Sequence, residues 1–501
     1  MSVELLSAHG LPDTAVLGDF LQRQRWFAGR GRALSGVGVH DVAVLHEGEP
    51  AVLLVLLSAA YADGGPEERY QVPLAVRHAE APADLGEKLL VQNEQDGGLV
   101  SVYDALAEPA LAWWFWQAMA ESRTVATQNG ELRYHSEGLR LQPDETGLIR
   151  SLGREQSNTS LVRDDTDVLK VVRKVEAGTT PELEMTRALA RAGFTSIAAP
   201  LGSGEYVERG GEPAVVAMLQ PYLHNGTEGW TLALTSLRDL YANAEENMPG
   251  DDEARRRAVA EQGSSFQPEA ARLGEVTADM HLALADASLD EEMRTHPVTE
   301  RTLNAWADEM TADLDRLLRN DAPELAPLRA RRPSLLQRFD ALRALDGDAG
   351  LSIRIHGDYH LGQVLRVDAG WVILDFEGEP DRPLAARRVR SSPLRDVAGM
   401  VRSFHYAAAA ALMERCTPDN EGWEQLYLQG EVWAQASSDA FWTAYEAHAR
   451  SSEELLPSPE ATRVLLVAFA TQKAIYEVGY ELGHRPDWVT IPLRYLLAEA
   501  V

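Results

Sequence analysis

One short stretch of the chain holds the residues whose types and spacing best suit chemistry. Asp358 lies five residues before Gln363, and Asp375 follows twelve residues later, at the end of an apolar segment. The carboxylate and the metal-binding amide of kinase catalytic loops are likewise five positions apart. A carboxylate near an acceptor hydroxyl, followed by an amide oxygen and a second carboxylate, suits magnesium-assisted phosphoryl transfer. The spacing therefore predicts Asp358 as the residue that activates a hydroxyl, with Gln363 and Asp375 as magnesium ligands.

Three other side chains of this stretch could take part. Glu377 lies two residues after Asp375, so on a strand both would point to one face, and Glu377 could assist with the metal. His356 and His360 form a single H-x-x-x-H pair, which is weak evidence for zinc without a third ligand. We expect His356 to be a packed, hydrogen-bonding support for the loop. The alternative is a β-hairpin whose polar residues only cap turns, but the order of three oxygen donors favours catalysis.

Phosphoryl transfer also needs a cation for the nucleotide phosphates and an acid that holds this cation. Val168–Val172 alternates like a strand and carries Lys170 near its middle. A helix is predicted over Pro181–Ala192, with proline in its first turn, and Glu184 lies near its start. We expect Glu184 to pair with Lys170. The alternative for each is an ordinary surface position.

A polar segment precedes Lys170 where many kinases have a glycine-rich loop. Its hydroxyls and amides could meet phosphate oxygens. A strand that ends at Met218–Tyr222 is predicted to be a hinge whose backbone groups bind adenine. The nucleotide-binding residues predicted besides Lys170 and Glu184 are Ser157, Asn158, Thr159, Ser160, Gln220 and Tyr222.

Polar residues recur along one face of the helix predicted over Ala468–His484. Other positions of this helix are apolar, as expected for a two-sided helix. Aromatic faces can stack on sugar rings while Lys and Glu bond hydroxyls, so a sugar site is one interpretation, and a solvent-facing stripe is the other. The stripe consists of Lys473, Tyr476, Glu477, Tyr480 and His484.

The order of the predicted elements indicates an α+β fold. Strands dominate the first part of the chain, with a helix over Ser101–Glu121, and helices dominate after Tyr222. A β-rich island over Leu351–Glu379 interrupts the helices and contains Asp358. The length of 501 residues favours several domains or subdomains over one core.

Composition narrows the function classes. Lys and Arg total 47 against 77 Asp and Glu, which gives a net charge of −30 and disfavours nucleic-acid and membrane partners. No apolar run approaches the roughly 20 residues of a membrane helix, and the first residues do not resemble a signal peptide. Cys416 is the single cysteine, so an intrachain disulfide and a cysteine-rich metal site are excluded. We expect a cytoplasmic protein.

Taken together, these motifs resemble the maltokinase family of aminoglycoside-phosphotransferase-like kinases. The resemblance runs from about residue 20 to 495 and implies a bilobal protein-kinase-like fold. It implies an N-terminal cap subdomain over residues 1–88 on a β-rich N-lobe, a nucleotide-binding remainder of the N-lobe over 89–221, and a helical C-lobe over 222–501 with the catalytic and sugar sites. The segments that carry it are Gln24–Arg30, Gln156–Ser160, Thr227–Trp230, His356–Gln363, Asp375–Pro380 and Ser392–Met400.

The resemblance also implies an activity. Family members transfer the γ-phosphate of ATP to the anomeric hydroxyl of maltose, and the maltose 1-phosphate serves α-glucan synthesis. ATP and Mg²⁺ are the implied cofactors, a small sugar the implied substrate, and a trehalose- or maltose-converting enzyme a possible partner. Carried over by position, Asp358 is the base and Lys170 the phosphate contact. The predicted substrate-binding set is His360, Lys473, Tyr476, Glu477, Tyr480 and Trp488.

Two alternatives to maltose phosphorylation stay open. Gly479 and Gly483 leave the polar stripe less filled than in maltokinases, and His405 stands where the family leads us to expect an acid. These departures keep a glucosamine kinase, forming glucosamine 6-phosphate, as the main rival. A catalytically inactive binding module is the third interpretation. It is disfavoured because Asp358 and Lys170, together with both predicted magnesium ligands, are present.

Overall fold

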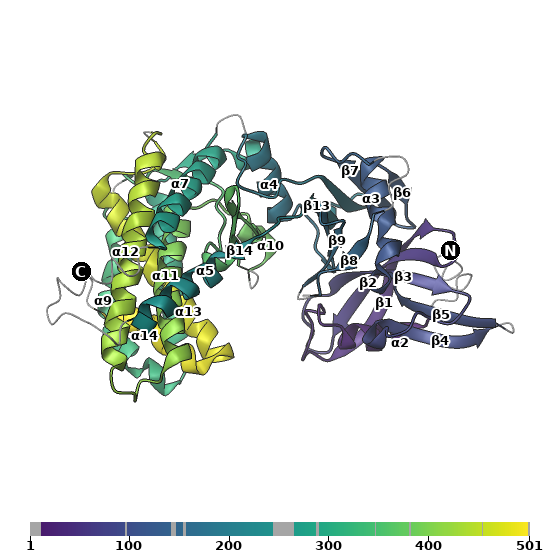
Figure 1. Ribbon diagram of the computed structural model, residues 1–501, viewed down its shortest axis with the longest axis horizontal. Coiled ribbons are helices and arrows are strands. Elements are labelled where there is room, and N and C mark those ends of the chain that lie inside the picture. Colours follow the sequence, from purple (N-terminus) through teal and green to yellow (C-terminus); the bar gives the residue numbers. More distant parts are fainter. Residues whose placement is uncertain are drawn as a thin grey trace. The chain divides into compact units, whose positions relative to one another are not determined.

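The computed structural model describes residues 12–95, 98–141, 147–153, 157–243, 265–286, 290–345, 347–379, 382–452 and 454–498. The chain forms two compact units: Met1–Glu184 with Ala198–His224, and Met185–Ile197 with Asn225–Val501. The first unit is built mainly from strands and the second mainly from helices (Figure 1). Among the described helices, none combines the length and the apolar character needed to cross a bilayer.

The first sheet belongs to the first unit and has the order β1-β2-β3-β5-β4, with β11 paired to β3. Side chains of β2 alternate between two buried clusters: Leu53 and Val55 pack toward helix α2, and Leu54 packs on the opposite face. Both faces of β2 are therefore covered, which explains its unbroken apolar run. The bounds are α2 (Thr14–Arg23), β1 (Leu34–His46), β2 (Ala51–Tyr61), β3 (Glu68–Arg77), β4 (Leu89–Gln95), β5 (Gly98–Asp104) and β11 (Lys174–Val175).

The second sheet of this unit has the order β6-β7-β12-β13-β10-β9-β8. Strand β10, which carries Lys170, therefore lies between β9 and β13, and Lys170 is opposite Ser160 on one side and Met218 on the other. The bounds are β6 (Thr124–Ala126), β7 (Gly130–Ser136), β8 (Ile149–Ser151), β9 (Asn158–Arg163), β10 (Asp167–Val172), β12 (Gly202–Glu208) and β13 (Pro213–Pro221).

The helix predicted over Ser101–Glu121 is shorter than expected. Ser101–Asp104 belong to β5, because their side chains pair across to β3 and are buried there. Two 3-10 turns, η2 (Ala105–Ala107) and η3 (Pro109–Ala112), follow before α3 (Trp113–Ala120). Pro109 has no N–H to donate to an earlier turn, which explains why a continuous helix begins only after it.

A buried arginine fastens the second sheet to the first. Arg173 follows β10, and its guanidinium donates to Asp104 at 2.6 Å and to Thr159 at 2.8 Å. Both charged side chains of the Arg173–Asp104 pair are fully buried, and Arg173 also lies over the ring of Trp26. Burying either charge without its partner would be costly, so this pair fixes the end of β10 against the first sheet.

Helix α4 (Pro181–Arg191) begins at the predicted residue. In the second unit, α7 packs against α12, and α11 packs against both α12 and α13 (Figure 1). Its small sheets are β14-β17-β18 and β15-β16. The helices are α5 (Gly229–Asn243), α7 (Gln267–Leu284), α8 (Glu300–Leu318), α9 (Ala326–Arg343), α10 (Leu384–Arg387), α11 (Leu394–Arg415), α12 (Trp423–Ala449), α13 (Pro459–His484) and α14 (Thr490–Leu497). The strands are β14 (Thr227–Glu228), β15 (His296–Pro297), β16 (Leu351–Ser352), β17 (Val364–Val367) and β18 (Gly370–Ile373).

Candidate functional site

The loop between β16 and β17 carries Asp358 and is organised by His356. The buried imidazole donates from Nε2 to the carbonyl of Leu374 at 2.8 Å, and its Nδ1 accepts from the backbone N–H of Asp358 at 3.3 Å. The two contacts together require a neutral ring with its proton on Nε2. The prediction that His356 supports the loop is confirmed.

A second support is the buried carboxylate of Asp396, in the first turn of α11. It accepts the backbone N–H groups of His356 at 2.8 Å and Gly357 at 2.9 Å, and His281 Nε2 lies 3.2 Å away. Burial works to raise the pKa of Asp396, but the contact with His281 and the other hydrogen bonds outweigh it, and the pKa lies below its ordinary value. The carboxylate therefore stays ionised and anchors the backbone next to Asp358.

The sequence analysis gave Asp396 no role of its own. The available signal was an acid in the helix start Leu394–Met400, which is apolar apart from this acid and Arg395, because a buried acid must find donors. Helix α11 also approaches the loop closely at Gly399, where a β-carbon would meet the carbonyl oxygen of Tyr359 at 2.6 Å. Only glycine fits this contact without movement of the backbone.

Replacing Asp396 tests this anchoring. Asp396→Ala leaves two buried N–H groups without their acceptor, so we expect a loss of about 3 kcal/mol or more in the free energy of unfolding, measured with denaturant. Because the folded pKa is depressed, the carboxylate's contribution is present above about pH 4 and is lost as the pH falls further. The difference between wild type and Asp396→Asn should therefore shrink below pH 4. A difference independent of pH would contradict this account.

Asp358 itself lies between two basic side chains. Lys473 Nζ is 3.0 Å from Oδ1, and His360 Nε2 is 3.7 Å from Oδ2. Burial works to raise the pKa of the Asp358 carboxyl, but Lys473 and His360 outweigh it and hold the pKa far below its usual range. Asp358 is thus ionised at any physiological pH and can accept a hydroxyl proton in a hydrogen bond. His360 lies near Asp358 because the two residues are only two positions apart in the same loop.

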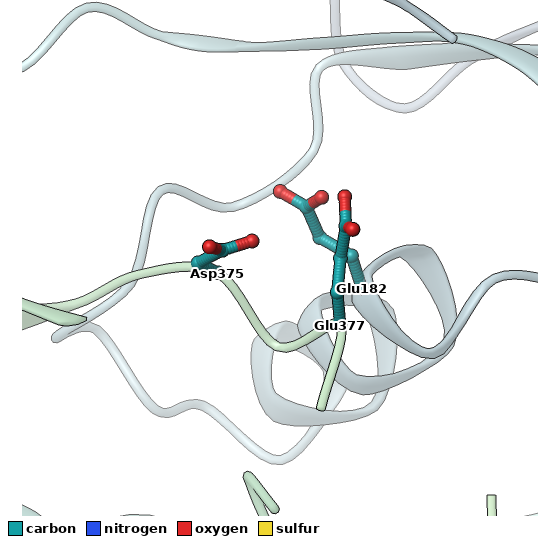
Figure 2. A group of neighbouring side chains, drawn as sticks. All are labelled: Glu182, Asp375 and Glu377. Carbon is teal, nitrogen blue, oxygen red and sulfur yellow. The ribbon is translucent and has the colours of Figure 1, made fainter. Parts of the chain in front are cut away.

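The predicted magnesium ligands lie just beyond this loop. The backbone of Gln363 is fixed by a hydrogen bond from the N–H of Leu374 to its carbonyl at 2.9 Å. Strand β18 ends at Ile373, so the expectation that Asp375 and Glu377 alternate on a strand is wrong. Instead Asp375 has a positive φ of 60°, and the turn places the Asp375 and Glu377 carboxylates within 4.8 Å of each other (Figure 2). Two such hard oxygen donors fit Mg²⁺.

In the first unit, Lys170 pairs with Glu182. The Nζ–Oε2 distance is 2.5 Å, and Glu182 is almost completely buried in the first turn of α4 (Figure 2). The sequence analysis missed Glu182 and expected Glu184, which lies in the same turn. Nothing in the sequence distinguishes the two acids, because the rotation of α4 about its axis depends on packing. A contact between Lys170 and Glu184 stays a prediction.

The other predicted nucleotide residues lie along the same sheet. On β9, Asn158 and Ser160 are partly exposed and Ser157 is exposed, but Thr159 is buried with its hydroxyl bonded to Arg173. The hydroxyl of Thr159 therefore cannot meet phosphate, and that prediction is wrong because strand side chains alternate. Gln156 lies outside the described residues. Gln220 ends β13 beside β10, and the N–H of Tyr222 donates to the carbonyl of Thr166 at 2.9 Å.

A cavity of about 760 Å³ opens in the second unit beside the catalytic loop. The face of α13 that carries Lys473, Tyr476, Tyr480 and His484 lines it, so the polar stripe faces this cavity. The rings of Tyr480 and His484 stack with centroids 4.3 Å apart. Glu309 and Asp313, on α8, add carboxylates to the wall.

Three of the predicted sugar contacts, His360, Glu477 and Trp488, are not among the residues that line this cavity. Glu477 pairs with the buried Arg402 at 2.6 Å and is not among the residues that line the cavity, and its contact with a sugar stays a prediction. Glu477 lies four residues after Lys473 and therefore on the same side of α13, where Arg402 of α11 reaches it. Trp488 follows α13 in η7 (Pro486–Trp488), and Arg485 lies over its ring at 4.4 Å. Trp488 is likewise outside the cavity lining.

Comparisons with known proteins agree with this geometry. A family model described as the maltokinase N-terminal cap domain matches residues 20–107, and one described as a phosphotransferase enzyme family matches residues 149–378. The first of these matches reaches β4 and β5, which complete the first sheet beyond the predicted boundary at residue 88.

Curated relatives and solved structures are also similar to the chain. A glucosamine kinase of Streptacidiphilus jiangxiensis is 31% identical over 343 residues, which cover 68% of this chain and 70% of that protein. One from Mycolicibacterium smegmatis is 26% identical over 348 residues, covering 68% and 77%. A solved glucosamine kinase in complex with glucosamine, ADP and inorganic phosphate has a TM-score of 0.64 at 23% identity, covering 96% of this chain and 99% of that one. A second crystal form has a TM-score of 0.66 at 24% identity, with the same coverage.

Proposed function

Because the chain belongs to the maltokinase-like family of aminoglycoside-phosphotransferase-like kinases and is an ATP-dependent sugar kinase, we propose that its acceptor is glucosamine and its product glucosamine 6-phosphate. The observation that carries the proposal is the acidic wall of the cavity beside Asp358. Glucosamine bears an ammonium group near neutral pH, and Glu309 and Asp313 offer carboxylates for it. Each already has a basic or amide partner, but a carboxylate accepts up to about four hydrogen bonds.

The residues divide the reaction between them. Asp358 accepts the hydrogen bond of the acceptor hydroxyl and takes its proton as the phosphoryl group is transferred. Lys170, held by Glu182, neutralises charge on the nucleotide phosphates. Gln363, Asp375 and Glu377 would hold Mg²⁺, which supplies further neutralisation of phosphate charge when it is bound. The ring faces of Tyr476 and Tyr480 orient the sugar.

Maltose is the second candidate, and the sequence analysis placed it first. The cavity volume favours it, since about 760 Å³ exceeds what one sugar ring fills. The rings of Tyr476, Tyr480 and His484 also continue along the wall, as a second sugar ring would require. Glucosamine is preferred because the two curated relatives described above, from Streptacidiphilus jiangxiensis and Mycolicibacterium smegmatis, are glucosamine kinases.

Initial rates of ADP formation with glucosamine, glucose, maltose and an aminoglycoside test the proposal. We expect kcat/KM for glucosamine to exceed that for glucose by about tenfold, because glucose lacks the ammonium group that would pair with the partly exposed carboxylates of Glu309 and Asp313. Glu309→Gln should remove much of this preference without changing glucose turnover, and Arg382 would keep its second partner, Glu379. A higher kcat/KM for maltose would favour the second candidate. Equal values for glucose and glucosamine would contradict ammonium recognition.

A further inference from the structure

Helix α13 delivers a single ammonium group to the catalytic loop from a position 115 residues away. Lys473 Nζ lies 3.0 Å from Asp358 Oδ1 and 3.4 Å from Glu379 Oε1. It also lies 4.9 Å from the ring centroid of Tyr476, one turn further along the helix. The ammonium group is thus surrounded by two carboxylates and an aromatic face.

Contacts on both sides of Lys473 set the position of the helix. Gln472 donates to Asp313 of α8 at 2.9 Å and accepts from Arg395 of α11 at 2.9 Å. One turn later, the ion pair between Glu477 and Arg402 joins α13 to α11. With α13 held at these two levels, the side chain of Lys473 emerges toward Asp358, and only 19% of it is exposed.

Lys473 bonds only one of the two oxygens of the Asp358 carboxylate, and the other oxygen is left for a further hydrogen bond. Lys473 occupies Oδ1, while Oδ2 has His360 at 3.7 Å, beyond hydrogen-bond distance. Because the Lys473 ammonium group is hydrogen-bonded to Oδ1, rotation of the Asp358 carboxylate is restricted and Oδ2 keeps a fixed direction. Burial works to lower the pKa of Lys473, but Asp358, Glu379 and Glu477 outweigh it and raise the pKa, so the group stays charged.

We propose that Lys473 is a positioning residue for Asp358: its ammonium group fixes the carboxylate so that Oδ2 meets the acceptor hydroxyl, while Glu379 and Tyr476 hold the ammonium group. The proposal rests on the role of Asp358 in the proposed function, but not on which sugar is the acceptor. It replaces the sugar-binding role that the helical stripe suggested for Lys473. Removing a positioning group lowers kcat, whereas removing a sugar ligand raises KM.

The test compares Lys473→Met with Lys473→Arg, using whichever sugar the wild type phosphorylates. We expect Lys473→Met to lower kcat by about 10²-fold, with the acceptor KM within about twofold of wild type, because the carboxylate is no longer held. Lys473→Arg keeps a cation within reach and should retain at least about a tenth of wild-type kcat. Arg238→Met is the matched control, since it removes another cation that pairs with a glutamate, Glu414 of α11, and it lies outside the cavity lining and the contacts that hold α13.

Arg238→Met should keep kcat within about twofold of wild type and change the melting temperature little, because both side chains of its ion pair are exposed. A rise of tenfold or more in acceptor KM for Lys473→Met, with kcat unchanged, would show a sugar ligand and overturn the proposal, as would unchanged kcat and KM. If Lys473→Met does not fold, Lys473→Gln decides by the same two constants, because it keeps a donor without the charge. Wild type inactive on glucosamine but active on another sugar would overturn only the acceptor assignment.

Discussion

Asp358→Asn is expected to lower kcat by about 10³-fold or more, while ATP still binds with near wild-type affinity. The amide of the variant cannot take the proton of the acceptor hydroxyl. The substitution also removes the ionised carboxylate to which Lys473 is hydrogen-bonded. Coupled measurement of ADP formation gives kcat, and calorimetric titration with ATP shows whether nucleotide binding survives.

Asp368→Asn is the matched control for this substitution. Asp368 lies between β17 and β18, is exposed, and hydrogen-bonds only to Asn225 among the contacts described. We expect its kcat to stay within about twofold of wild type, as for most surface positions. Turnover of Asp358→Asn within tenfold of wild type would remove Asp358 from its assigned role.

Lys170→Met has the second largest expected effect: a fall of about 10²-fold or more in kcat/KM for ATP. The variant loses the cation that we propose for the nucleotide phosphates, and it leaves the buried Glu182 without the ammonium group 2.5 Å away. Stability should also fall, because an acid that loses its buried partner is costly. Steady-state kinetics with varied ATP and a saturating sugar measure the first effect, and thermal unfolding measures the second.

Three further variants show whether the effect of Lys170→Met is specific to this lysine and which acid is its partner. Lys174→Met removes a neighbouring lysine whose partner is Glu68, and it should leave kcat/KM unchanged. Glu182→Gln should reproduce most of the loss seen in Lys170→Met, whereas Glu184→Gln should have the smaller effect. A larger effect of Glu184→Gln would restore the partner that the sequence predicted. Unchanged kinetics of Lys170→Met would remove this lysine from the nucleotide site.

Local patterns predicted the order of the chemical groups well. The spacing from Asp358 through Gln363 to Asp375 identified the loop, and the alternation around Lys170 together with the helix start at Pro181 matched β10 and α4. These features depend on neighbours in sequence, where strand and helix periods and proline preferences act directly.

What depends on packing between distant segments was not predictable. The rotation of α4 about its axis decides whether Glu182 or Glu184 points toward Lys170. Asp396 can accept the backbone N–H of His356 only because α11 packs against the loop that carries Asp358. Thr159 points inward because strand side chains alternate on β9, and its hydroxyl there accepts a hydrogen bond from Arg173. On α13 the sequence predicted the face that carries Lys473, but not that Asp358 lies within 3.0 Å of it.

The most direct test of the account is phosphorus and proton NMR of wild-type protein with ATP, magnesium and glucosamine. The account predicts that the γ-phosphate signal of ATP is replaced by a phosphomonoester coupled to the protons on C6 of glucosamine, and that Asp358→Asn does not form it. Loss of the γ-phosphate only to inorganic phosphate, or no loss of ATP at all, would contradict the proposal that glucosamine is the acceptor.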